Sequence, residues 1–145
     1  MPLADHKSRV LILDTLPSEK ARIMLQYYVN KSNRFWKIMF MAFHEPYQSD
    51  YRMKKQMLLR HGIALWNVLE EEIPYEQSND FQTFFQTHSS VARIIFNGNH
   101  AAACYIRHIG YGGGITYTTL PSTSSLNTWK SFEEKAEVWS QELRK

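Results

Sequence analysis

Four short apolar segments that alternate with helical patterns constrain the fold of this chain more than any other feature. They lie at residues 10–13, 63–66, 93–96 and 115–119, and the first, Val-Leu-Ile-Leu, is apolar without interruption. An unbroken apolar run is typical of a strand that is covered on both faces, because neither side meets water. The alternation therefore predicts an α/β fold in which right-handed crossovers link a parallel sheet of about four strands, with helices on both faces.

Helical segments are predicted from apolar spacing and from residues that begin helices. Ser18 follows the first strand and is placed to cap a helix through its hydroxyl group. Ser131 and Glu134 have the spacing of a capping box. The predicted helices follow Ser18, cover residues 33–43, 50–61 and 100–108, and begin near residues 79 and 131.

Length and composition fit one folded unit. The chain has 145 residues, of which 43% are hydrophobic, so we expect a single domain over residues 1–145. Its apolar stretches are far shorter than the roughly 20 residues that cross a bilayer. The first eight residues lack the apolar core of a signal peptide. We expect an intracellular, cytoplasmic protein with no membrane partner, associated with the nucleoid if it is bacterial.

Cysteine and histidine usage limits the metal chemistry that can be expected. Cys104 is the only cysteine, which excludes an internal disulfide and a site built from four thiolates. We expect Cys104 to be a small buried hydrophobic residue on a helix. The six histidines are scattered and show no spacing of metal ligands, so no metal is predicted. The net charge of +3 is compatible with a polyanionic partner without requiring one.

Small polar residues follow the predicted strands, at residues 14–18, 67, 97–98 and 120–124. In open parallel sheets, ligands bind outside the carboxyl ends of the strands. Two of these exits carry Leu-Pro-Ser, and hydroxyl groups beside free helix amides suit a phosphate. The same residue types also cap helices, which is the alternative interpretation. The glycines at 112–114 precede a strand, so no phosphate loop and no nucleotide hydrolysis are expected.

The segment QYYVNKSNRFW holds a further candidate group, Asn33. As the first residue of an aromatic helix, Asn33 is a good N-cap. It is also a neutral group that can hold a water molecule or the edge of a base. Tyr27 and Tyr28 offer flat faces on which an extruded base could stack.

Six segments of the chain, together and in this order, resemble the uracil-DNA glycosylase superfamily. They are VLILDTLPS, QYYVNKSNRFW, GIALWNVL, NDF, IIFNGNHAA and LPSTSSLN, and the resemblance covers residues 9–139. The resemblance is closest to the branch of hypoxanthine-DNA glycosylases, also called DNA-deoxyinosine glycosylases, which is related to mismatch-specific thymine/uracil-DNA glycosylases. It implies a three-layer α/β/α sandwich with a central four-stranded parallel sheet. It also implies base flipping and hydrolysis of a deaminated base (hypoxanthine, or else uracil or xanthine) from damaged duplex or single-stranded DNA. We expect a monofunctional, monomeric enzyme without a metal or other cofactor.

The resemblance also implies roles for individual residues. Asn33 corresponds to the catalytic asparagine of this branch, whereas the position used by other branches is here Leu16, which cannot serve. The second motif opens with Leu120 instead of the histidine of classical uracil enzymes. The implied base pocket consists of Asp14, Thr15, Leu16, Tyr28, Phe35 and Asn97. The implied phosphate-binding residues are Pro17, Ser18, Ser122, Thr123 and Ser124. Leu126 is the candidate wedge that fills the gap left by a flipped base, in a loop around residues 125–127.

Three departures from the family pattern keep other hypotheses open. Asp14 replaces a glycine, and a carboxylate there would repel phosphates or an anionic base unless it is turned away or paired. Asn67 replaces an aspartate, and residues 70–76 form an acidic segment in place of a serine-rich one. The alternatives are a divergent homologue with weakened or lost activity that acts as a binding protein, and a hydrolase of free nucleosides or nucleotides.

Overall fold

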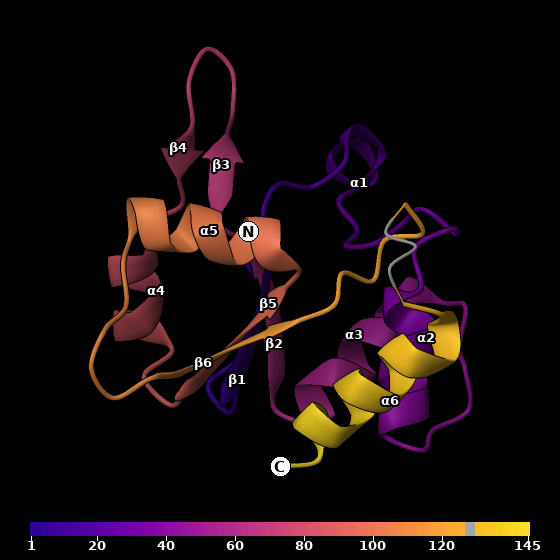
Figure 1. Ribbon diagram of the computed structural model, residues 1–145. Helices are drawn as coiled ribbons and strands as arrows, with labels where there is room; N and C mark the ends of the chain where they lie inside the picture. The colour runs from indigo at the N-terminus through magenta and orange to yellow at the C-terminus, as the bar shows by residue number, and fades with distance from the viewer. Residues whose placement is uncertain (127–129) are drawn as a thin grey trace.

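The computed structural model describes residues 1–126 and 130–145 and contains a four-stranded parallel sheet (Figure 1). The strands lie in the order β2–β1–β5–β6, and each strand runs parallel to its neighbours. The predicted parallel sheet is thereby confirmed. Its strands are β1 (Val10–Asp14), β2 (Ile63–Asn67), β5 (Arg93–Asn97) and β6 (Thr116–Leu120).

The register of the sheet brings the polar strand exits together. Asp14 pairs with Asn67 across β1 and β2, and Asn97 pairs with Leu120 across β5 and β6. Leu13 pairs with Phe96, so the ends of β1 and β5 are also level. Because parallel strands all end at the same edge, the segments that follow them meet on one side of the molecule.

Helices cover both faces of the sheet, which gives the predicted three layers (Figure 1). The longest helix has 12 residues. Across the described ranges, no helix combines the length and the apolar character that a membrane crossing requires. One face is covered by α2 (Phe35–Ala42), α3 (Tyr51–Arg60) and α6 (Phe132–Leu143), the other by α4 (Phe81–Thr87) and α5 (Asn99–His108), while α1 (Glu19–Met24) follows the first strand exit.

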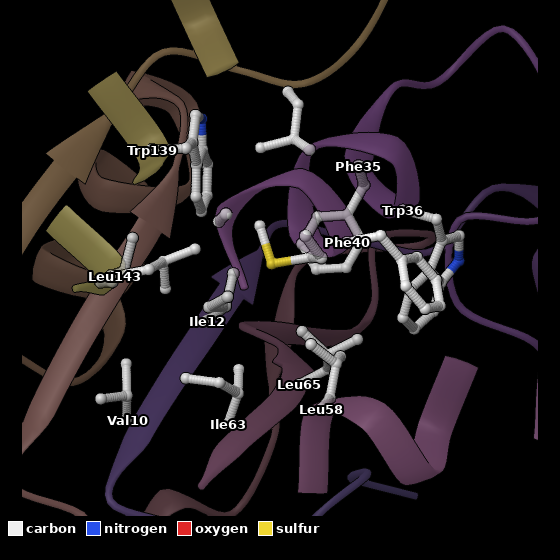
Figure 2. Packing of buried hydrophobic residues seen from close by; sticks show 14 of the residues in the cluster. Val10, Ile12, Phe35, Trp36, Phe40, Leu58, Ile63, Leu65, Trp139 and Leu143 are labelled. Carbon is white, nitrogen blue, oxygen red and sulfur yellow. The ribbon is translucent and has the colours of Figure 1, made fainter. Parts of the chain in front are cut away.

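Alternate residues of β1 supply the two halves of the core. Ile12 faces α2 and α6, where it packs in one buried cluster with Phe35 and Trp139 (Figure 2). Leu11 and Leu13 face the opposite side and join the cluster under α4 and α5. This division is the period-2 pattern of a strand that is buried on both faces.

A two-stranded antiparallel hairpin was not predicted. It consists of β3 (Leu69–Glu71) and β4 (Gln77–Ser78), and the acidic segment forms its outer part. In the sequence this segment is mostly acidic and lacks the apolar alternation that marks a strand. Figure 1 shows the hairpin rising at the same end of the molecule as α1.

Candidate active site

A cavity of about 380 Å³ lies at the carboxyl edge of the sheet. Its volume falls in the range of small-molecule sites, about 300–1,000 Å³. Residues from the first strand exit, from the segment between α1 and α2, and from the segment after β6 form its wall. They are Asp14, Leu16, Pro17, Ser18, Ala21, Tyr27, Tyr28, Val29, Asn30, Ser32, Asn33, Asn67, Ser124, Ser125 and Leu126.

A continuous chain of hydrogen bonds runs beside this cavity. The Tyr28 hydroxyl group donates to Asp14 Oδ2 over 3.2 Å. Asn97 Nδ2 donates to the Tyr28 oxygen over 2.9 Å and to Thr123 Oγ1 over 3.0 Å. Thr123 Oγ1 in turn donates to Asn33 Oδ1 over 2.8 Å. Five side chains from four separate parts of the sequence are thus held in one network.

Two backbone amides fix the direction of these bonds. The Thr123 N–H group donates to Asn97 Oδ1 over 2.9 Å, and the Phe35 N–H group donates to Asn33 Oδ1 over 2.9 Å. Because a backbone N–H group can only donate, both oxygens are assigned and the amide groups cannot be reversed. Among the described residues, none is hydrogen-bonded to Asn33 Nδ2. The NH₂ group of Asn33 is therefore the side of the amide that is left to donate to a ligand.

The position of Asn33 differs slightly from the prediction. Helix α2 begins at Phe35 with Arg34 as its N-cap, so Asn33 lies one residue before the cap. Its side chain still accepts the Phe35 amide, as the short asparagine side chain commonly does two residues along the chain. Asn33 therefore combines the local capping bond with the long-range bond to Thr123.

Asp14 is held by hydrogen bonds in the wall of the cavity. Its Oδ1 accepts the Thr15 amide over 2.8 Å, and Oδ2 accepts the Tyr28 hydroxyl group. Burial raises the pKa of Asp14, while the bonds from Thr15 and Tyr28 and the charge of His100 oppose that rise. The carboxyl group is thus turned toward donors, which moderates the repulsion expected from the sequence.

The two aromatic residues predicted for the base pocket have different positions. Tyr28 lines the cavity, and its ring stacks on Phe35 with centroids 4.0 Å apart and an angle of 16° between the ring planes. Phe35 is fully buried at 0% exposure and is absent from the described cavity wall. Phe35 therefore supports Tyr28 from the core and does not reach a base directly. Burial holds the pKa of Tyr28 well above its usual value, so the hydroxyl group stays protonated as a donor.

A second, open groove of about 1,100 Å³ adjoins the first cavity. Thr15, Asn97, Ser122 and Ser124 line it, whereas Pro17 and Ser18 lie on the first cavity. The hydroxyl oxygens of Ser122 and Ser124 accept backbone amides two residues on, over 3.2 Å each. Their O–H groups can still donate, which suits the predicted contact with phosphates.

Comparisons with known proteins identify the family of this chain. Residues 1–142 match the sequence model of the uracil DNA glycosylase superfamily. The chain belongs to that superfamily. A relative named hypoxanthine DNA glycosylase from Methanosarcina acetivorans is 32% identical over 135 residues, which are 85% of this chain and 83% of the relative. A second relative of the same name, from Methanosarcina barkeri, is 26% identical. The match covers 99% of this chain and 96% of that relative.

A solved structure supports the same relationship. It is the solution NMR structure of a Methanosarcina acetivorans protein that is provisionally named a uracil DNA glycosylase. The TM-score is 0.79 at 27% identity, and the match covers 99% of this chain and 94% of the other. The superfamily fold predicted from the sequence is thereby confirmed.

Thr123 does not fit the role that the superfamily resemblance implied. The side chain is 0% exposed, and its hydroxyl group is engaged by Asn97 and Asn33. A buried group with both partners inside the protein cannot also bind a phosphate of the DNA backbone. In the structure, the Thr123 hydroxyl group instead donates to Asn33 Oδ1 over 2.8 Å.

The remaining residues that the sequence predicted for the site are Leu126, Leu16 and Ser18. Leu126 is 91% exposed and lines both hollows, as a wedge residue would need. Leu16 lies on the first cavity and Ser18 caps α1 by accepting the Ala21 amide over 3.1 Å. Residue 127, which the predicted loop includes, lies outside the described residues.

Several lining residues were not assigned to the site from sequence. Asn67, which is 8% exposed, was noted as a strand exit and as a departure from the family pattern but not as a site residue, yet it lines the first cavity. Its place after an apolar strand is the signal that could have included it. His100 in the first turn of α5 and Lys130 line the open groove, and they have no comparable signal in the sequence.

Proposed function

We propose that this protein is a DNA glycosylase that flips a deaminated base out of DNA and hydrolyses its N-glycosidic bond, with hypoxanthine as the preferred base. The observation that carries the proposal is the fixed orientation of Asn33, whose Oδ1 accepts two donors and whose NH₂ group is left for a ligand at the cavity. Both relatives described above are named hypoxanthine DNA glycosylases, which supports the choice of base.

The chemistry requires donors more than a strong base. As the glycosidic bond breaks, positive charge develops on the sugar and negative charge on the departing base. A preorganised donor near the base stabilises that charge in a site from which water is largely excluded. Asn33 Nδ2 is such a donor, and the N3, N7 and carbonyl oxygen atoms of hypoxanthine are acceptors. Tyr28 supplies an aromatic wall at the cavity for the flipped base.

The two Leu-Pro-Ser segments would bind the phosphates of the DNA backbone on either side of the flipped nucleotide. Pro17 and Ser18 lie at the first cavity, and Ser122 and Ser124 lie along the open groove. We infer a monofunctional enzyme, because a lyase step needs an amine nucleophile beside the sugar. Lys130 lies on the adjoining open groove, and the described wall of the first cavity includes no lysine. A water molecule then completes the hydrolysis.

The test is cleavage of labelled duplexes that carry a single hypoxanthine, uracil or xanthine, followed by hot alkali to break the abasic strand. Wild-type protein is expected to release hypoxanthine fastest. Asn33→Ala is expected to slow release by about 100-fold or more, as is typical when one preorganised donor is lost. Wild-type activity that Asn33→Ala leaves unchanged would contradict the proposed role of Asn33.

A second candidate function follows from Asp14 and the acidic hairpin. A carboxyl group in the cavity wall and the exposed Glu70, Glu71 and Glu72 beside the first strand exit favour a homologue that binds a partner without catalysis. Activity that appears only in Asp14→Gly would identify a glycosylase scaffold that Asp14 has switched off. Inactivity of wild type and of both variants would favour the binding protein.

A hydrolase of free nucleosides is the remaining alternative from the sequence. Its affinity for duplex DNA distinguishes such a hydrolase from a DNA glycosylase. A glycosylase contacts phosphates and releases counterions, so its affinity for DNA falls as the salt concentration rises. Cleavage of inosine together with salt-independent, negligible DNA binding would replace the DNA glycosylase proposal.

A further inference from the structure

Three side chains outside the candidate active site converge where the β3–β4 hairpin meets α5. Glu76 immediately precedes β4, and Cys104 and His108 belong to α5. One ligand atom from each residue lies within 4.8 Å of the other two. Cys104 and His108 are four residues apart on the helix, so they share one face, and the hairpin brings Glu76 onto it.

The contacts of this cluster show that it attracts positive charge. Glu76 Oε1 accepts Arg107 Nη2 over 2.6 Å and lies 2.7 Å from His108 Nε2. Both contacts are made to the same carboxylate oxygen. The Arg107 side chain is 53% exposed, so its guanidinium group can swing into solvent without opening the core. Cys104 is fully buried beneath this group of polar atoms.

The donor set matches one metal in particular. A thiolate, an imidazole nitrogen and a carboxylate oxygen are the three kinds of ligand that Zn²⁺ takes from proteins, and three protein ligands leave a fourth tetrahedral position for water. Ca²⁺ and Mg²⁺ prefer oxygen ligands alone. The distance between Glu76 Oε1 and His108 Nε2 is 2.7 Å. It needs to widen only slightly for an ion to enter, because two ligand atoms of one zinc ion are usually a little over 3 Å apart.

We propose that Glu76, Cys104 and His108 form a Zn²⁺ site that joins the β3–β4 hairpin to α5. On binding, the Cys104 thiol loses its proton to solvent, and the His108 ring nitrogen that ligates the ion gives up any proton that it carries. The ion replaces the Arg107 guanidinium group as the cation beside Glu76. The site is separate from the cavity that holds Asn33, and it does not depend on the proposed glycosylase activity. Its effect is to fix the hairpin, which borders the first strand exit.

The experiment titrates the purified full chain with Zn²⁺ by calorimetry and, separately, with Co²⁺ by absorption spectroscopy. Cys104 is the only cysteine, so a thiolate-to-cobalt charge-transfer band reports on this site alone. Cys104→Ala is expected to abolish that band. Cys104→Ala, His108→Gln and Glu76→Gln are each expected to weaken Zn²⁺ binding by more than about 100-fold, the upper range seen for outer-shell partners.

Arg107→Ala and His88→Gln are the control variants. Arg107→Ala removes the competing cation, so it is expected to bind Zn²⁺ at least as tightly as wild type. His88 is a histidine at the end of α4 that contacts the Phe84 carbonyl oxygen outside the cluster, and His88→Gln should leave the affinity unchanged. Circular dichroism checks that each variant is folded. One-to-one binding that survives in folded Cys104→Ala, or no binding by wild type, would overturn the proposal and leave the cluster as an ion-pair network.

Discussion

The Thr123 hydroxyl group occupies the centre of the hydrogen-bonded chain that holds Asn33. It accepts from Asn97 and donates to Asn33, while the Thr123 amide fixes the orientation of Asn97. Since Asn33 is the proposed catalytic donor, the activity should depend on a residue that touches neither base nor phosphate.

Thr123→Val tests this dependence. It keeps the volume and removes the hydroxyl group, so Asn33 Oδ1 loses one of its two donors. We expect kcat to fall by about tenfold to 100-fold with little change in KM, because a misplaced group affects the chemical step more than binding. Single-turnover base release measures the effect, and Thr123→Ser should restore most of the rate. Thr118→Val on the same stretch of chain is the control, and an equal loss in that variant would contradict a specific role for Thr123.

Asp14→Asn tests the charge in the cavity wall. Burial raises the pKa of Asp14, so the folded state favours the protonated form. That contribution to stability is fully present below the pKa of the unfolded chain and is lost as pH rises through the folded pKa. The free energy of unfolding of Asp14→Asn should therefore increase relative to wild type as pH rises from about 3 to about 7. Urea denaturation at several pH values measures the difference, and a pH-independent difference would count against the shift.

At the scale of elements, the junction of β5 and α5 depends on a glycine. Gly98 has a φ of 94°, and its amide donates to the Leu120 carbonyl oxygen over 2.9 Å. A Cβ atom at this position would lie 3.1 Å from Ser122 Cβ. The positive φ favours glycine here, and the close approach of the second Leu-Pro-Ser segment leaves little room for a side chain.

Gly98→Ala is expected to lower the free energy of unfolding by about 1–3 kcal/mol, the cost of a strained backbone residue. It should also shift Ser122 and weaken DNA binding. Gly113→Ala is the matched control, since a Cβ atom there meets nothing within 4 Å, and its effect should stay within about 0.5 kcal/mol. Urea denaturation compares the two, and equal stabilities would show that the junction tolerates a side chain.

At the scale of the whole molecule, the balance of charge provides only a weak electrostatic attraction to DNA. The net charge is only +3, and the exposed acidic residues of the hairpin lie beside the first strand exit. Arg22 contacts the Glu70 carbonyl oxygen over 3.2 Å, which joins α1 to the same hairpin. Under the proposed function, specific contacts from the hydroxyl-rich exits would supply much of the affinity for DNA.

Replacing Glu70, Glu71 and Glu72 by glutamine tests this balance. We expect duplex DNA to bind several-fold more tightly at low ionic strength, because three negative charges near the phosphates are removed. The gain should vanish near 1 M salt, where the screening length is about 3 Å. Fluorescence anisotropy at a series of salt concentrations measures both effects. An unchanged affinity at low salt would place the bound DNA away from the hairpin.

The sequence by itself determined the parallel sheet and the edge of the sheet at which the candidate site lies. Apolar runs and helix caps are local patterns, so they predicted four parallel strands and the polar residues after them, including Asp14 and Asn97. Asn33 was a candidate from its residue type before an aromatic helix, and the family segments implied its catalytic role. The beginning of α2 was predicted two residues early, because a side chain that accepts a nearby amide resembles an N-cap when only its residue type is known.

Only the tertiary structure decided which groups meet. It placed Phe35 behind Tyr28, enclosed Thr123 between two asparagines, and brought Glu76 to Cys104 and His108. The contacts of Thr123 with Asn33 and Asn97, and of Glu76 with α5, join residues that are far apart in sequence. They depend on the strand order and on how each connecting segment packs. Residue spacing reports the period of a single helix or strand, so it cannot reveal which side chains of separate elements share a cavity or a cluster.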